Sequence, residues 1–288
     1  MNAVNQTFRK HLRLAQDYPL AFVIILFSFV MVIYSGCTSN RLPHALGYLF
    51  VVWAGAFITD LVVNINPKPA IGFPIIKPVM RELFFIIICT SLGFIFLFIR
   101  FRSNWDTMNP FVKLSLLPLI LFTFPIVLAI VYLFRYKYKP SELGVNFRYW
   151  YLPLIIHILV GTITLCVAPD RSHWKAAIQE SGMINLLFTG FITAALPEEF
   201  LRLLLQTRLG VAFRNLGLGF VTATFIWAVM HIPTESHDEK TINWAATALR
   251  TCTLMPIGFL WGYITHRTKS LFPSVFIHGL NLWGLQNM

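Results

Sequence analysis

Long apolar runs separated by short polar segments make up most of the chain. A helix needs about 20 mostly apolar residues to cross roughly 30 Å of hydrocarbon. Nine runs approach that length and are predicted to be membrane spans: residues 20–36, 45–63, 83–99, 111–134, 149–167, 184–205, 218–231, 244–264 and 272–285. Because the seventh run is short, the pattern predicts an all-α fold, a polytopic transmembrane helix bundle of about eight to nine spans.

Two interruptions of this pattern organise the chain. Residues 64–78 are rich in proline and glycine and are predicted to be a loop. Residues 140–145 follow a basic segment and precede an aromatic and basic stretch suited to the membrane interface, so they predict a short amphipathic approach to the fifth span. We therefore divide the chain into N-terminal transmembrane helices, residues 1–139, and a second helix bundle, residues 140–288, which holds every candidate site residue.

Composition agrees with a membrane protein. Hydrophobic residues make up 57% of the chain and charged residues 12%, whereas soluble domains carry roughly 25% charged residues. The net charge of +11 comes from short segments between apolar runs, which is typical of topogenic and lipid-headgroup contacts and not of a nucleic-acid surface. These basic segments fall on alternate connections, which predicts a cytoplasmic N-terminus; Arg100 and Arg102 are the exception. We expect an integral protein of a bacterial cytoplasmic membrane, with the lipid bilayer and no nucleic acid as a partner.

The cysteines do not indicate a disulfide framework or a thiolate metal site. They are scattered one per apolar region without paired spacing: Cys37, Cys89, Cys166 and Cys252.

A few polar side chains interrupt the last apolar runs, where desolvation costs several kcal/mol each unless they face one another or a polar cavity. Their types suit water activation and proton transfer. They are Glu198, Glu199, Arg202, His231, His278 and Asn281. Taken singly, each also fits a structural role, such as a buried ion pair or an interhelical hydrogen bond.

Taken together, these residues resemble the CAAX-protease and bacteriocin-processing family of intramembrane proteases. The resemblance rests on the Glu-Glu-Arg cluster, the histidine on the next span, and the histidine and asparagine that share a face of the last span. The resemblance covers roughly residues 140–288. That family carries Glu-Glu-x-x-x-Arg, Phe-x-x-x-His and His-x-x-x-Asn motifs. Here Arg202 comes one residue early, Trp227 stands where the family has phenylalanine, and Asn281 is the third residue after His278, not the fourth. The early arginine leaves open which glutamate is the base.

The resemblance implies hydrolysis of a peptide bond by an activated water. It implies that the first glutamate and the histidine of the second motif activate the water, and that the last histidine and asparagine stabilise the oxyanion. The residue types agree with these roles. Glu198, with Glu199 as the alternative, is expected to take a proton from water together with His231. His278 and Asn281 are expected to donate hydrogen bonds to the oxyanion.

Arg202 is expected to orient the glutamate pair and not to react. Two histidines and a carboxylate are a sufficient ligand set for zinc with one open position. However, His231 and His278 lie 47 positions apart without a His-Glu-x-x-His run. Metal-free catalysis without a cofactor is therefore favoured over zinc.

Three functions stay open at this stage. The favoured one is a peptidase acting on a membrane-associated protein or peptide, such as a prenylated C-terminal tetrapeptide, a leader peptide or a sorting tail. The others are a non-proteolytic scaffold or immunity protein of the same fold, and a proton-coupled transporter, which should show repeated halves. Outside these motifs, Asp60 is an acid deep in the second span, and we expect it to pair helices and not to relay protons.

Overall fold

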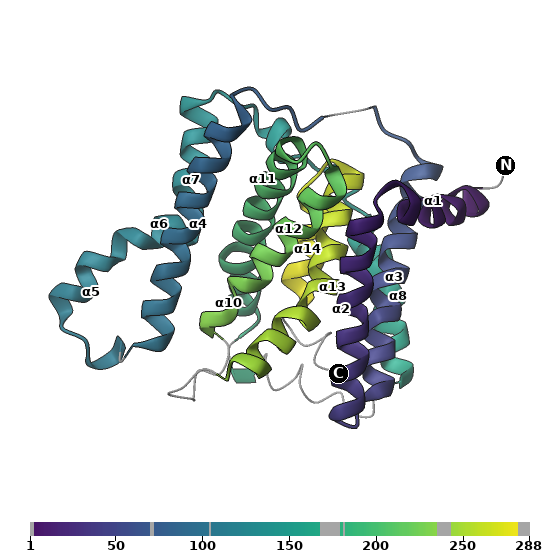
Figure 1. Ribbon diagram of the computed structural model, residues 1–288, viewed down its shortest axis with the longest axis horizontal. Coiled ribbons are helices and arrows are strands. Elements are labelled where there is room, and N and C mark those ends of the chain that lie inside the picture. Colours follow the sequence, from purple (N-terminus) through teal and green to yellow (C-terminus); the bar gives the residue numbers. More distant parts are fainter. Residues whose placement is uncertain are drawn as a thin grey trace.

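The computed structural model describes residues 3–69, 72–103, 105–167, 179–180, 182–234 and 243–281, and within these ranges it is helical without a strand (Figure 1). The main helices are α1 (Ala3–Asp17), α2 (Pro19–Thr38), α3 (Leu42–Ile65), α4 (Val79–Arg102), α8 (Leu152–Val167), α10 (Met183–Phe188), α11 (Leu196–Ala212), α12 (Leu216–Val229), α13 (Trp244–Thr268) and α14 (Phe272–Asn281). The predicted all-α class is confirmed.

Short helical pieces connect these helices. Between α4 and α8 lie η1 (Trp105–Thr107), α5 (Pro110–Leu116), η2 (Leu117–Leu119), α6 (Ile120–Thr123), α7 (Ile126–Ile130), the π-helical η3 (Val131–Arg135) and η4 (Pro140–Leu143). A second π-helical segment, η5 (Thr189–Ala195), joins α10 to α11, and η6 (Ile232–Thr234) follows α12. The predicted loop lies between α3 and α4, and the approach predicted at residues 140–145 contains η4.

The protein has helices that can cross a membrane, but the predicted count of eight to nine spans is not confirmed. Among the described residues, four helical stretches are long and apolar enough: Pro19–Thr38, Leu42–Ile65, Val79–Arg102 and Met183–Ala212. A fifth would combine Pro110–Thr123 with Ile126–Arg135, which meet at 53°. The sequence pattern predicted one continuous helix there. Pro125 stands at the break, and a proline lacks the N–H that would continue the helix.

The N-terminal basic segment forms a helix of its own. The first predicted span begins at residue 20, and the helix α1 that precedes it packs across α2 and α3 at one end of the bundle (Figure 1). Lys10 Nζ and His11 Nε2 of α1 approach the fully buried Asp60 carboxylate of α3 at 2.8 and 3.0 Å. Tyr263 and Arg267 of α13 also donate to this carboxylate. Asp60 therefore joins three helices, which is the geometry of a helix-pairing group.

A second buried charge cluster joins α4 to α11. The Glu82 carboxylate accepts hydrogen bonds from Arg208 Nε at 2.8 Å, Tyr132 Oη at 2.9 Å and Tyr138 Oη at 2.6 Å. Glu82 and Arg208 are both almost completely buried. Because the charge is compensated on several sides, this cluster can sit inside the bundle.

The helices that carry the candidate site approach each other closely. A Cβ atom on Gly219 of α12 would lie 2.2 Å from the backbone nitrogen of Gly210 in α11, so only glycine allows this contact. In α13, Pro256 interrupts the helical hydrogen bonds. The Tyr48 hydroxyl from α3 repairs that break, because it donates to the Thr253 carbonyl at 3.2 Å and accepts from the Ile257 N–H at 3.0 Å.

Candidate functional site

The two adjacent glutamates occupy the first turn of α11 but enter different surroundings. They follow Pro197, which in turn follows the wider π-helical turn of η5. Successive residues of an α-helix are rotated by about 100°, so neighbours face different partners. The Glu198 side chain is 30% exposed, whereas the Glu199 side chain is fully buried.

Glu199 is enclosed by two cationic or hydrogen-bonding partners. Its carboxylate forms an ion pair with Arg202, one helical turn later, and its Oε1 lies 3.0 Å from His278 Nδ1 of α14. The Arg202 guanidinium is also buried and lies over the rings of Trp227 and Trp261, with its Cζ 5.3 and 5.6 Å from their centroids. These cation–π contacts stabilise a buried cation that has few other partners. Of the two glutamates, Glu199 is the one that pairs with Arg202, and the orienting role of Arg202 stays a prediction.

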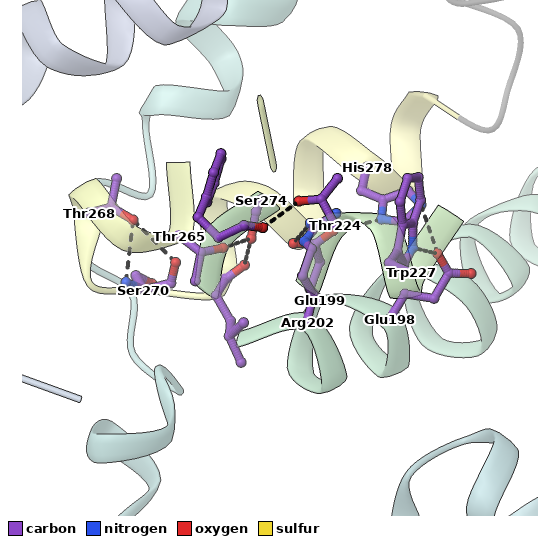
Figure 2. Close-up of polar contacts among 12 residues, drawn as sticks. Glu198, Glu199, Arg202, Thr224, Trp227, Thr265, Thr268, Ser270, Ser274 and His278 are labelled. Atoms are coloured by element: carbon purple, nitrogen blue, oxygen red, sulfur yellow. Dashed lines mark hydrogen bonds and ion pairs between the residues drawn. The ribbon is translucent and has the colours of Figure 1, made fainter. Parts of the chain in front are cut away.

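Three groups converge on Glu198, two from α12 and the turn that directly follows it and one from α14. Its Oε2 accepts a hydrogen bond from Trp227 Nε1 at 2.6 Å (Figure 2). The same oxygen lies 3.7 Å from His231 Nε2 and 3.7 Å from His278 Nε2. These two separations exceed a direct hydrogen bond and suit contacts shared with a water molecule.

The hydrogen-bond partners of the histidines fix their tautomers. His231 Nδ1 lies 3.0 Å from the backbone carbonyl of Trp227, which can only accept, so Nδ1 carries the proton. In the neutral ring, His231 Nε2 is then an acceptor, and it faces Glu198. His278 Nδ1 likewise faces the Glu199 carboxylate and carries a proton. The His278 ring stacks on Trp261, with centroids 3.6 Å apart and planes at 13°.

A polar turn between α13 and α14 sets the position of His278. Thr265 and Ser274 share a hydroxyl hydrogen bond at 2.6 Å across the two helices, and Ser270 Oγ donates to the Asn146 carbonyl at 2.5 Å. The Leu271 N–H donates to the carbonyl of Gly144, whose φ of +81° suits a residue without a Cβ. Figure 2 shows this turn leading into the helix that carries His278.

The structure brings together five of the six predicted site residues, namely Glu198, Glu199, Arg202, His231 and His278. The sixth, Asn281, ends α14, and its side chain lies outside the described residues. In the described part of the chain, no group of three or more His, Cys, Asp or Glu side chains is arranged to hold a metal ion. Metal-free catalysis stays a prediction.

Sequence reasoning missed two tryptophans of the site. Trp227 was noticed only as an aromatic replacement for phenylalanine, whereas its indole N–H donates to Glu198. Trp261 stacks on His278 and lies under Arg202. Nothing in the sequence marks Trp261, because it sits in an ordinary apolar run. The change from phenylalanine to tryptophan at position 227 was a signal, since only tryptophan adds a donor.

Comparison with known protein families agrees with this arrangement. Residues 180–283, which contain both glutamates and both site histidines, match the family described as type II CAAX prenyl endopeptidase Rce1-like. The match confirms the resemblance of this segment to CAAX proteases, a membrane-embedded family that acts on peptides. The apolar helices support an integral membrane protein. Searches of curated proteins and of solved structures found no match.

Proposed function

We propose that the chain is an intramembrane endopeptidase in which Glu198, and not Glu199, is the general base. The observation that carries this assignment is the contrast between the two carboxylates. Glu198 is partly exposed and faces the Nε2 atoms of both site histidines at 3.7 Å. Glu199 is buried and already held by Arg202 and His278. A base must reach the water that it activates, and a carboxylate enclosed by protein cannot.

The proposed reaction begins with a water held between Glu198 and His231. Glu198 takes one proton, and the resulting hydroxide oxygen forms a bond to the carbonyl carbon of the scissile peptide. The acceptor lone pair of His231 Nε2 orients the water. When the C–N bond breaks, the proton held by Glu198 passes to the departing amine, directly or through His231. Product release leaves both groups in their starting protonation states.

His278 is proposed to stabilise the oxyanion of the tetrahedral intermediate. Because its Nδ1 proton faces Glu199, its Nε2 can donate only when the ring is doubly protonated. The buried Glu199 carboxylate supports that charged form, and the Trp261 ring holds the imidazole plane in place. We retain Asn281 as the second donor, one helical turn after His278 on the same face.

The family description supports a prenylated peptide ending in a CAAX tetrapeptide as the first substrate to test. The full-length protein should be reconstituted in vesicles with a farnesylated fluorogenic peptide, a leader peptide and a membrane-anchored sorting tail. Glu198→Gln and His231→Ala should each lower turnover at least ~100-fold. Glu180→Gln is the matched control, since Glu180 is an exposed glutamate outside the site. Full activity in both site variants would reject Glu198 and His231 as the catalytic pair. If the wild-type protein cleaves none of the three substrates, the peptidase assignment is rejected and a scaffold or transporter is left.

A further inference from the structure

A second polar site lies at the other end of the same helices. A cavity of about 700 Å³ opens between α1, α2, α12 and α13, and neither Glu198, His231 nor His278 lines it. Gln206 does line it, eight residues after Glu198 on α11, which is about 12 Å along the helix axis. Cavities of this volume hold small-molecule ligands in other proteins.

The charge of this cavity is strongly positive. Its lining includes a single acidic side chain and five basic ones: Arg9, Lys10, Arg13, Arg267 and Lys269. Lys10 and Arg267 pair with Asp60, but Arg9, Arg13 and Lys269 form no ion pair with any described residue. Burial lowers the pKa of Lys10, although Asp60 partly opposes this, and burial together with nearby Arg267 lowers the pKa of Lys269. An anion in the cavity would offset the cost of this desolvation, because a nearby opposite charge favours the protonated forms.

A buried amide gives an independent sign of a ligand. The Gln206 side chain is 6% exposed and lines the cavity, yet it has no hydrogen-bond partner among the described residues. The polar atoms of this amide are not sealed off by protein, so a ligand in the cavity can reach them and form hydrogen bonds with them. The Tyr263 and Asn64 side chains also line the cavity and supply further polar groups.

The position of the cavity along the helices and its apolar wall on the α2 side indicate the kind of anion. Tyr18, which lines the cavity, lies just before the start of α2, and Asn64, which also lines it, lies just before the end of α3. The cavity therefore sits where these two spans meet the membrane interface. Its wall on the α2 side is apolar, with Ala21, Phe22 and Ile25. Phosphate groups and acyl chains of lipids meet at this depth.

We propose that this cavity binds an anionic phospholipid, whose phosphate contacts Arg9, Arg13, Lys269 and the Gln206 amide while an acyl chain follows the apolar wall of α2. This proposal does not depend on the peptidase activity. A free phosphate would satisfy the same basic groups but would leave the apolar wall without a contact, so the two ligands can be separated by experiment.

The test is native mass spectrometry of the full-length protein in a non-ionic detergent. The protein is titrated with dioleoyl phosphatidylglycerol, dioleoyl phosphatidylcholine or inorganic phosphate. Phosphatidylglycerol should bind saturably and more tightly than the other two. The double variant Arg9→Gln/Arg13→Gln should weaken its binding at least ~10-fold, since each basic residue near an anionic headgroup contributes roughly fivefold. Arg81→Gln, an exposed arginine on α4 outside the cavity, should bind as wild type does.

A second variant guards against loss of folding. Gln206→Leu should weaken phosphatidylglycerol binding roughly fivefold without lowering the Tm of the lipid-free protein, because the amide has no protein partner to lose. Equal binding of phosphatidylcholine, or unchanged binding by the double arginine variant, would overturn the proposal. Phosphate binding as tight as that of the lipid would overturn the lipid assignment.

Discussion

The sharpest prediction separates the two adjacent glutamates by exchanging each for glutamine. In Glu198→Gln, the Trp227 N–H can still donate to the amide oxygen, and the side chain stays partly exposed. We therefore expect a change in the free energy of unfolding within about 0.5 kcal/mol and a loss of turnover of at least ~100-fold.

In Glu199→Gln, the opposite pattern is expected. The change leaves the Arg202 guanidinium buried without its counter-charge, and breaking such a pair costs about 3–5 kcal/mol. The amide oxygen of the new side chain can still accept from His278 Nδ1, so we take the lower end, about 3 kcal/mol. For a chain of this size that lowers the Tm by roughly 6–12 °C. At temperatures below its thermal unfolding transition, this variant should lose less turnover than Glu198→Gln does.

The assay measures Tm in detergent and turnover in vesicles for both variants and for Glu199→Gln/Arg202→Met. The double variant removes both buried charges and should recover most of the lost Tm, because no uncompensated charge remains. The assignment of the base would be refuted if Glu199→Gln were inactive but as stable as wild type while Glu198→Gln stayed active.

Three further predictions concern the hydrogen bond of Trp227, the need for a metal, and the close contact between α11 and α12. Trp227→Phe keeps an aromatic ring but removes the hydrogen bond to Glu198. The kcat should therefore fall roughly tenfold, while the Tm stays nearly unchanged. An unchanged kcat would show that the indole N–H has no positioning role. Dialysis against a chelator should leave turnover intact, and recovery of lost activity by zinc would favour a metal mechanism. Gly219→Ala should lower the Tm in detergent by several degrees, at about 1–3 kcal/mol, because the new methyl group meets the Gly210 backbone, whereas Gly47→Ala has nothing within 4 Å and should not.

Part of this architecture could be predicted because it depends on local pattern. Apolar runs of about 20 residues fix helices and a membrane setting wherever they stand in the chain. The predicted starts at residues 244 and 272 agree with α13 and α14, and the described residues of the proline- and glycine-rich stretch after α3 are non-helical. The predicted span count is not confirmed, and local pattern is a weak guide to it because proline breaks such as that at Pro125 depend on how neighbouring segments repair the lost hydrogen bonds.

The sequence by itself determined which residue types could do chemistry, since glutamates and histidines in hydrocarbon are costly unless they are used or paired. It could not decide between Glu198 and Glu199, because adjacent residues share the same local pattern. Only the packing of α11 against α12 and α14 decided that Arg202 and His278 enclose Glu199, while Trp227 and the two Nε2 atoms face Glu198. Apart from the Glu199–Arg202 pair within α11, those contacts join residues 29 to 80 positions apart, and such pairings are set by the tertiary fold.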